Sequence, residues 1–454
     1  MEDSAQFDKM TKTGIPRLII SLSVPTVVSM LVTSVYNMAD TYFVSKLGTS
    51  ASGAVGIVFS LMAIIQAVGF TIGMGSGSMI ARLLGKRDDK GAAEYAASAF
   101  FLGITVGIIL AAAGIFKIRD LMLLFGSTQT ILPYAVSYAR YIILGTPVMI
   151  GAFIMNNLLR SQGKARYAMF GIASGGVLNV ALDPLFIFVF KMGTAGAAAA
   201  TLLSQCVSFV ILLSMFLKGK SSVRLSAKNI SRSPKLYWTI FKTGLPSLSR
   251  QGLASIAAML LNRSAAVYGD SAVAAMSIVG KIFMIIFAVM IGIGQGFQPV
   301  AGFNFGAKLY GRVKKAMFFV LFLGMGVMIA MGVPTFVFAD KLMSCFTKDD
   351  AKVIEIGRYA LRMQCIALPL IPMNTVCNMT FQMTGKSWRA TLLACSRQGI
   401  FFIPLILILP KMYGLWGVQA AQPLADALAA VLAAPFGAAF LREMKKSGRT
   451  GNTG

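Results

Sequence analysis

Three carboxylates stand out because they fall within long apolar stretches of the chain: Asp40, Asp183 and Asp426. An ionisable side chain at membrane depth costs several kcal/mol, so it is a functional candidate by default. Such an acid can carry a proton, bind a cation or pair with a base. The sequence contains no histidine, which excludes a proton relay or a metal site built on imidazole.

Asp40 and Asp183 are expected to lie at the same depth. Lys46 follows Asp40 by six residues, and Lys191 follows Asp183 by eight residues. At a rise of about 1.5 Å per helical residue, each carboxylate lies roughly 9–12 Å beneath its outer charged flank. Both acids belong to the same half of the chain. The sequence therefore predicts that they share one pocket.

The neighbours of these two acids are polar as well. Asn179 precedes Asp183 by four residues, on the same helical face, and Thr201 has a similar expected depth in the next apolar run. Oxygen ligands of this kind suit a hard cation such as Na⁺. The carboxylates could instead carry a proton, because protonation removes the cost of burying a charge. Asp40, Asn179, Asp183 and Thr201 are thus the predicted ion-coupling site.

Other interpretations of the acids stay open at this point. Asp183 is followed by Pro184 and could merely satisfy backbone groups beside a kink. Asp40 could be a helix-end carboxylate that faces water. Asp426 could contact substrate or form a static ion pair, with Arg250 and Lys281 as candidate partners.

Composition identifies lipid as the main solvent of this protein. The 454 residues are 56% hydrophobic and 13% charged, whereas soluble domains carry about 25% charged residues. A formal net charge of +26 would suggest nucleic acid in a soluble protein. Here the basic residues lie in short clusters between apolar runs, so they indicate membrane topology and no nucleic-acid partner.

The apolar runs predict an all-α integral membrane protein with twelve transmembrane helices, because each run approaches the length of about 20 residues that spans a bilayer. The expected spans are 17–43, 52–80, 94–116, 132–158, 167–190, 194–216, 238–262, 272–303, 315–338, 356–383, 388–410 and 416–440. Alternate loops are rich in Lys and Arg, which predicts that both termini and the 217–237 linker are cytoplasmic. We expect a multi-pass protein of the cytoplasmic (inner) membrane.

The chain also repeats itself at a spacing of about 221 residues, which pairs Pro25 with Pro246 and Gly85 with Gly306. Each repeat holds six spans, so the two halves have the same orientation. The sequence predicts two six-helix bundles, 1–216 and 238–454, related by a pseudo-two-fold axis along the membrane normal. Pro25 and Pro246 each remove a helical hydrogen bond and are the predicted hinges.

Three segments resemble the multidrug and toxic compound extrusion (MATE) family: SVYNMADTYFVSKLG at 34–48, NNLLRSQGKARYAM at 156–169 and NVALDPLFIF at 179–188. The resemblance covers essentially the whole chain and points to the branch of the DinF-type and MepA-type exporters. That branch places its coupling acids in the first repeat. The vibrio-type branch also uses acids in spans 7 and 10, and this sequence has none at the matching depth.

The resemblance implies a secondary active multidrug exporter, with antiport of cationic or amphipathic drugs against H⁺ or Na⁺ by alternating access. It assigns the coupling site to Asp40, Asn179, Asp183 and Thr201, with any Na⁺ bound there. It places Tyr36 and Asn156 at the first-lobe cavity, and makes Pro25 the bend of the first span. Asn37 and Asp426 are further cavity candidates.

The remaining expectations concern partners and alternatives. We expect no cofactor beyond the coupling cation H⁺ or Na⁺, small amphipathic drugs and the bilayer as partners, and function as a monomer. An enzyme is disfavoured because the sequence offers no Ser–His or Cys–His pair and no metal-ligand spacing. The alternative is a flippase for lipid-linked or polyanionic substrates, which would require basic side chains in the cavity. Arg250 and Lys281 are the candidates for that role.

Overall fold

The computed structural model describes residues 2–347 and 350–450, which form helices and the loops that join them. A first lobe runs from α2 to α9 after a short N-terminal helix, α1. The bounds are α1 Glu2–Lys12, α2 Ile15–Ser45, α3 Thr49–Gly85, α4 Asp89–Phe116, α5 Ile118–Leu124, α6 Leu132–Leu144, α7 Thr146–Ser161, α8 Ala165–Pro184, the π-helical turn η1 Leu185–Val189, and α9 Gly193–Leu217.

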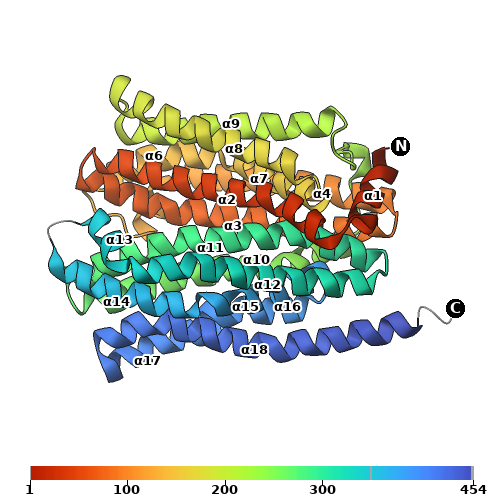
Figure 1. The fold of residues 1–454 in the computed structure, drawn as a ribbon. Helices are drawn as coiled ribbons and strands as arrows, with labels where there is room; N and C mark the ends of the chain where they lie inside the picture. The colour runs from red at the N-terminus through yellow and green to blue at the C-terminus, as the bar shows by residue number, and fades with distance from the viewer. Residues whose placement is uncertain (1, 348–349, 451–454) are drawn as a thin grey trace.

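A linker with one 3₁₀ turn, η2 (Ala227–Asn229), leads to a second lobe of the same plan. Its bounds are α10 Pro234–Ala266, α11 Asp270–Gly306, α12 Tyr310–Val337, α13 Ala339–Phe346, α14 Ala351–Ala367, the 3₁₀ turn η3 Leu368–Leu370, α15 Ile371–Met383, α16 Ser387–Cys395, the π-helical turn η4 Ser396–Phe402, α17 Ile403–Tyr413, and α18 Leu415–Thr450. Figure 1 shows the first lobe above the second, with their long helices side by side.

The all-α membrane architecture is confirmed, and helices occupy each of the predicted spans. Ten helices of the described chain are long and apolar enough to cross a membrane, and the bent pair α6 and α7 makes an eleventh. The predicted span 238–262 lies in α10, which has 33 residues but is less apolar. Lys242, Arg250 and Gln251 lower its hydropathy. Because α10 packs along α3 between the lobes, Arg250 and Gln251 are partly buried, whereas Lys242 is exposed.

Several predicted spans are broken rather than straight. The helices α6 and α7 meet at an angle of 52° beside Gly145, two residues before Pro147. In α8 the α-helix ends at Pro184 and continues as η1. Pro25 and Pro246, the predicted hinges, lie inside the continuous helices α2 and α10. Their role as hinges stays a prediction.

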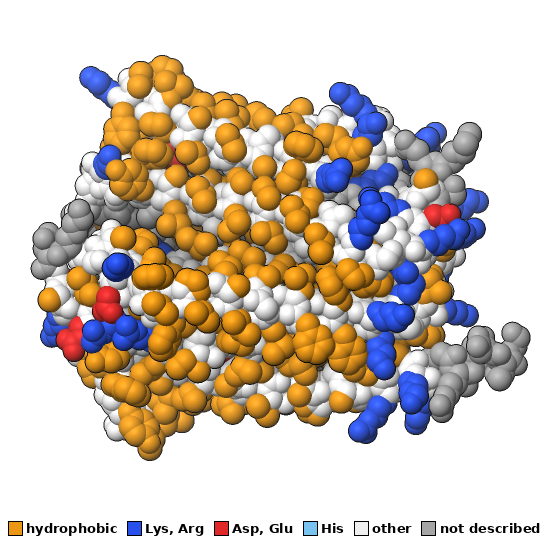
Figure 2. All heavy atoms as spheres, viewed as in Figure 1, with side chains coloured by type: hydrophobic (Ala, Val, Ile, Leu, Met, Phe, Trp, Pro, Cys, Tyr) orange, Lys and Arg blue, Asp and Glu red, His pale blue; other side chains and the backbone are white. Residues whose placement is uncertain are grey.

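Charge separates the two ends of the molecule. Figure 2 shows Lys and Arg side chains gathered at the right-hand end, while hydrophobic side chains cover the middle. The ends of the described chain lie at the same right-hand end (Figure 1). This arrangement is that of a multi-pass protein whose apolar belt faces lipid.

Reciprocal contacts between the lobes reveal the repeat in three dimensions. A Cβ atom added to Gly85 would lie 2.2 Å from the carbonyl oxygen of Phe303, and one added to Gly306 would lie 2.1 Å from the carbonyl oxygen of Arg82. Gly85 and Gly306 are repeat mates, and so are Arg82 and Phe303. Only glycine permits these backbones to approach so closely. The two contacts are therefore images of each other, as a pseudo-two-fold axis requires.

Hydrogen bonds extend this contact region between the lobes, which we call the seam. The Thr26 hydroxyl of α2 donates to the carbonyl of Gly292 at 2.6 Å, and the Ser78 hydroxyl of α3 donates to the carbonyl of Gln382 at 2.7 Å. These four residues are buried. The lobes are thus joined through backbone groups in the half of the molecule that holds the termini.

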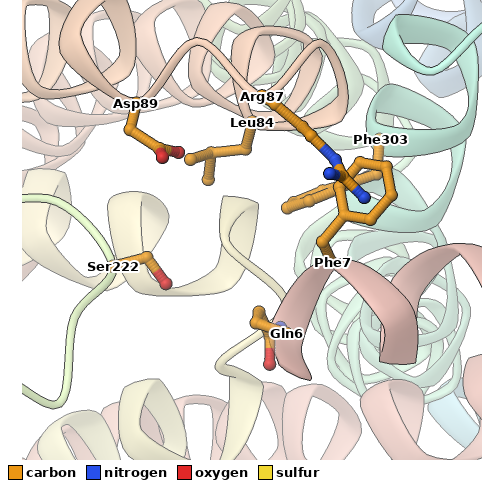
Figure 3. Close-up of a pocket in the computed structure, with 7 residues that line it drawn as sticks. All are labelled: Gln6, Phe7, Leu84, Arg87, Asp89, Ser222 and Phe303. Atoms are coloured by element: carbon orange, nitrogen blue, oxygen red, sulfur yellow. The ribbon is translucent and has the colours of Figure 1, made fainter. Parts of the chain in front are cut away.

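The N-terminal helix α1 closes the same end. The Asn304 amide donates to the carbonyl of Met10 at 3.1 Å, and the Gln6 amide donates to the carbonyl of Gln162 at 2.7 Å. Figure 3 shows the cavity beneath α1, with Arg87 extended over the ring of Phe7. This cavity of about 210 Å³ lies between the lobes at their basic end. Helix α1 therefore contacts both lobes.

Candidate ion-coupling site

Four helices of the first lobe bring polar side chains to one buried cluster. Asp40 comes from α2 and Tyr138 from α6. Asn179 and Asp183 come from α8, one turn apart, so both point to the same side of that helix. Thr201 comes from α9. All five side chains are buried, and Asp183 is 0% exposed.

Hydrogen bonds connect these side chains in two groups. The Tyr138 hydroxyl donates to Asp40 Oδ2 at 3.1 Å. The Asn179 amide donates to Asp183 Oδ1 at 3.1 Å and lies 3.3 Å from Thr201 Oγ1. Tyr138 also interacts with Thr201, and Asp183 interacts electrostatically with Asp40. The two groups therefore form one electrostatic unit.

The cluster contains more oxygen atoms than hydrogen-bond donors. Within the described chain, Asp40 Oδ1, Asp183 Oδ2 and Asn179 Oδ1 are buried and have no hydrogen-bond partner. An unpaired buried acceptor costs about 1–3 kcal/mol, and more if it is charged. Two carboxylates, an amide oxygen and hydroxyls are hard oxygen ligands. The residues present thus fit a small cation, and each carboxylate could equally take up a proton.

The cavity candidates Tyr36 and Asn37 lie near this cluster. Both are partly buried on α2, within one turn of Asp40. The Tyr36 ring packs over Gly176 of α8, where an added Cβ would lie 3.2 Å from it. Tyr36 also interacts electrostatically with Asp40. A change in the charge of Asp40 would therefore act directly on the packing of α2 against α8.

Asn156 is placed elsewhere and corrects the expectation that it faces a cavity. Its amide donates to the carbonyl of Ala168 at 3.0 Å and ties α7 to α8 near the basic end. Its repeat mate Asn378 donates to the carbonyl of Ala390 at 2.6 Å, so the bond is part of the duplicated scaffold. Both amides are buried. Asn156 therefore holds two helices together, away from the carboxylate cluster.

Asp426 of α18 belongs to a second buried cluster, and its partner corrects the expected pairing. Arg397 Nε donates to Asp426 Oδ1 at 2.6 Å, whereas Arg250 and Lys281 were the candidate partners. The Gln364 and Gln422 amides each donate to this carboxylate at 2.9 Å. Both of its oxygens are thus satisfied. The ion-pair interpretation of Asp426 agrees with this geometry.

Arg397 lies in the π-helical turn η4, well inside a span, and only 13% of its side chain is exposed. Its guanidinium also lies over the rings of Phe287 and Phe283, at 4.4 and 5.4 Å from their centroids. In the sequence, Arg397 follows the basic residues Lys386 and Arg389 by eleven and eight residues. The turn η4 carries its side chain into the lobe.

Sequence reasoning missed Tyr138 as a member of the first-lobe cluster. Tyr138 was visible in the sequence as the repeat mate of Tyr359, but nothing in its own segment indicates which face of α6 is buried.

Comparisons with known proteins agree with this architecture. A model of the MatE family matches residues 25–185 and again residues 246–408. The chain is 25% identical over 423 residues to the multidrug export protein MepA of Staphylococcus saprophyticus, which covers 93% of each chain. It is 26% identical over 424 residues to MepA of Staphylococcus aureus, again covering 93% of each. An outward-facing structure of a multidrug resistance MATE family transporter of the MOP superfamily matches with a TM-score of 0.92 and 27% identity, over 96% of this chain and 98% of that one.

Proposed function

Because this chain belongs to the MatE family, we propose that it exports cationic and amphipathic drugs across the cytoplasmic membrane in exchange for an inward-moving cation. The observation that carries the proposal is the set of three buried oxygens without a partner on Asp40, Asn179 and Asp183. The MepA relatives are named multidrug export proteins, which supports export of drugs. The cationic and amphipathic class is part of the proposal. The basic end with both termini is the cytoplasmic end, by the distribution of Lys and Arg.

The coupling step follows from the charges of the cluster. Without a cation, two buried carboxylates repel each other and attract water, which favours separation of α2 from α8. With a cation bound, the oxygens of Asp40 and Asp183 are neutralised and the four helices close around it. The two occupancies thus stabilise different packings of the first lobe. If a drug binds one of these two conformations more tightly, its binding is coupled to that of the cation by the difference between the two affinities.

Alternating access uses the seam between the lobes. The repeated architecture allows the two bundles to rock about a central path. In the conformation described, glycine contacts and α1 join the lobes at the basic end. Drug and cation would then exchange at the opposite end. The protein works as a monomer in this scheme, because both lobes lie on one chain.

The test is drug efflux from proteoliposomes in which pH and Na⁺ gradients are imposed independently at a clamped membrane potential. We expect wild type to move ethidium against its gradient when one of the two cations is supplied. The Asp40→Asn and Asp183→Asn variants should lose this movement. Asp120→Asn is the matched control, because Asp120 is 71% exposed on the outer surface. Full concentrative export by Asp40→Asn would refute the proposal.

A further inference from the structure

The N-terminal helix α1 belongs to one lobe by its chain and is bound to the other by hydrogen bonds. It leads through Thr13 into α2 of the first lobe. Two side chains of the second lobe hold its end. The Asn304 amide of α11 donates to the carbonyl of Met10 at 3.1 Å. The Arg312 guanidinium of α12 donates to the carbonyl of Thr13 at 2.6 Å, and its Nε donates to the Asn304 side-chain oxygen at 2.8 Å.

These bonds satisfy the carbonyl end of a helix. The last four carbonyls of an α-helix have no partner within the helix, and their partial negative charge favours a nearby cation. Because α1 ends at Lys12, the Met10 carbonyl is one of these four, and the Thr13 carbonyl lies just beyond them. Arg312 supplies the cation. The second lobe therefore caps the C-terminal end of a helix that the first lobe carries.

The first lobe contacts α1 through the turn between α7 and α8. The Gln6 amide of α1 donates to the carbonyl of Gln162 at 2.7 Å, and Met10 is fully buried. A Cβ atom added to Gly163 would lie 2.7 Å from Gln6 Nε2 and 2.7 Å from the Met10 sulfur. A side chain at this position would push α1 away. The helix therefore lies between the backbone of this turn and the second lobe.

The equivalent turn of the second lobe contacts the opposite lobe without such a helix. Gly385, in the turn between α15 and α16, is the repeat mate of Gly163, and a Cβ atom added to it would overlap the guanidinium of Arg82 in the first lobe. The repeat mate of Arg82 is Phe303, whose side chain lines the cavity beneath α1. In one half of the molecule a side chain thus reaches the turn directly, while in the other half α1 packs on it.

Helix α1 is packed less tightly than the rest of the seam. Elsewhere the backbones at Gly85 and Gly306 approach the opposite lobe too closely for a Cβ atom. Beneath α1, a cavity of about 210 Å³ lies between Gln6 and Phe7 of α1 and the ends of α3 and α11 (Figure 3). Atoms that line a cavity lack part of their van der Waals contacts. The hydrogen bonds of α1 therefore contribute a large share of what holds it in place.

We propose that α1 is a latch that keeps the basic end of the molecule closed, and that this end opens only after the second lobe releases the carbonyls of Met10 and Thr13. When the lobes separate at this end, α1 and α2 move away from α11 and α12, so both bonds must break. Their free energy stabilises the closed conformation alone and lowers the population of the open one. The inference rests on the proposed alternating access for its role in export, although opening can be measured without transport.

The test measures opening through a thiol placed in the seam. Ser78→Cys puts a thiol at a buried position that faces Gln382 of the other lobe. A charged maleimide reaches it only when the lobes separate, so the rate of alkylation follows the population of the open state, however small. In this background we expect Arg312→Met to raise the rate about tenfold, because it removes a charge-assisted bond. Gln6→Ala removes a neutral bond and should raise the rate about threefold. Peptide mass spectrometry distinguishes position 78 from the native cysteines.

Two controls separate release of the latch from general unfolding. Lys242→Met removes a charge from the same lobe, at an exposed position of α10 that forms no hydrogen bond within the described chain, and should leave the rate at position 78 unchanged. The native Cys377 is buried inside the second lobe against Gly437, so its alkylation reports unfolding and should stay slow in every variant. An equal rise at Cys377 and at position 78 in Arg312→Met would overturn the latch.

The latch and the proposed export can fail separately, because alkylation is measured without drug and without an ion gradient. An unchanged rate at position 78 in both Arg312→Met and Gln6→Ala would remove the latch and leave the export proposal standing. Full concentrative export by Asp40→Asn would refute the proposed function and leave the latch standing.

Discussion

The two lobes treat a buried carboxylate in opposite ways. In the first lobe, Asp40 and Asp183 each keep a buried oxygen without a partner. In the second lobe, Asp426 is bound by Arg397 and by two glutamine amides. The Arg397 guanidinium is part of the chain and cannot leave Asp426. A cation that binds Asp40 and Asp183 from solution could leave again. In the proposed function, the first lobe exchanges a cation and the second lobe keeps its ion pair.

The largest effect is expected at Asp183. Asp183→Asn removes the charge that makes the cluster a cation site and keeps nearly the same volume. Gradient-driven drug export should fall to the level of liposomes without protein, while passive drug binding persists. Efflux under an imposed cation gradient, set beside binding to the purified variant, measures this. Loss of binding together with export would mean that the variant is misfolded, and full export would place coupling elsewhere.

The second prediction removes the basic partner of the buried carboxylate in the second lobe, so that this carboxylate lacks a partner as those of the first lobe do. Arg397→Gln leaves Asp426 buried without its cation and should lower the free energy of unfolding by about 3–5 kcal/mol. Thermal unfolding of the purified variant measures the loss. The double variant Asp426→Asn with Arg397→Gln is the control and should recover stability. A double variant that is no more stable than Arg397→Gln would show that Arg397 acts through its packing on Phe287.

A smaller effect is expected when Tyr138 loses its hydroxyl. In Tyr138→Phe the deprotonated Asp40 loses a hydrogen bond, which for a charged acceptor contributes about 1.5–3 kcal/mol. The cation-bound state is then favoured. If the cation is a proton, the pH of half-maximal export should rise by about one unit. The pH profile of efflux measures the shift. Tyr134→Phe, an exposed tyrosine one turn away, should leave the profile unchanged.

The smallest effect concerns the scaffold that both lobes share. Asn156→Ala and Asn378→Ala each remove one buried hydrogen bond between helices and should each cost about 1–2 kcal/mol of stability. Neither should alter the cation dependence of export. Thermal unfolding and gradient-driven efflux of the two variants measure this together. A change of coupling ratio in Asn156→Ala alone would assign that side chain to the transport path.

Part of the first-lobe cluster could be predicted from the sequence. The depths of Asp40 and Asp183 follow from the rise of a helix and the positions of charged flanks, and Asn179 follows from its spacing of four. Tyr138 could not be predicted, since the buried face of α6 depends on how that helix packs in the lobe. The break beside Gly145 also depends on packing between neighbouring helices.

The second-lobe cluster was predicted less well for a different reason. Arg397 lies eleven residues after Lys386. The clustering of Lys and Arg along the sequence does not distinguish a residue inside the lobe from one in a basic loop at this spacing. The π-helical turn and the aromatic rings that accept its guanidinium are tertiary features. The low hydropathy of α10 has a related cause, because Gln251 donates to Gln66 of the other lobe. Sequence patterns report exposure to lipid more faithfully than they report contacts inside the bundle.

One measurement tests the central claim most directly: equilibrium binding of the coupling cation to purified protein, as ²²Na⁺ bound or protons taken up per molecule. Wild type should bind the cation, and Asp40→Asn and Asp183→Asn should each lose it. The double variant Asp426→Asn with Arg397→Gln should bind as wild type does. Cation binding that survives both first-lobe substitutions, or disappears with the second-lobe pair, would contradict the account.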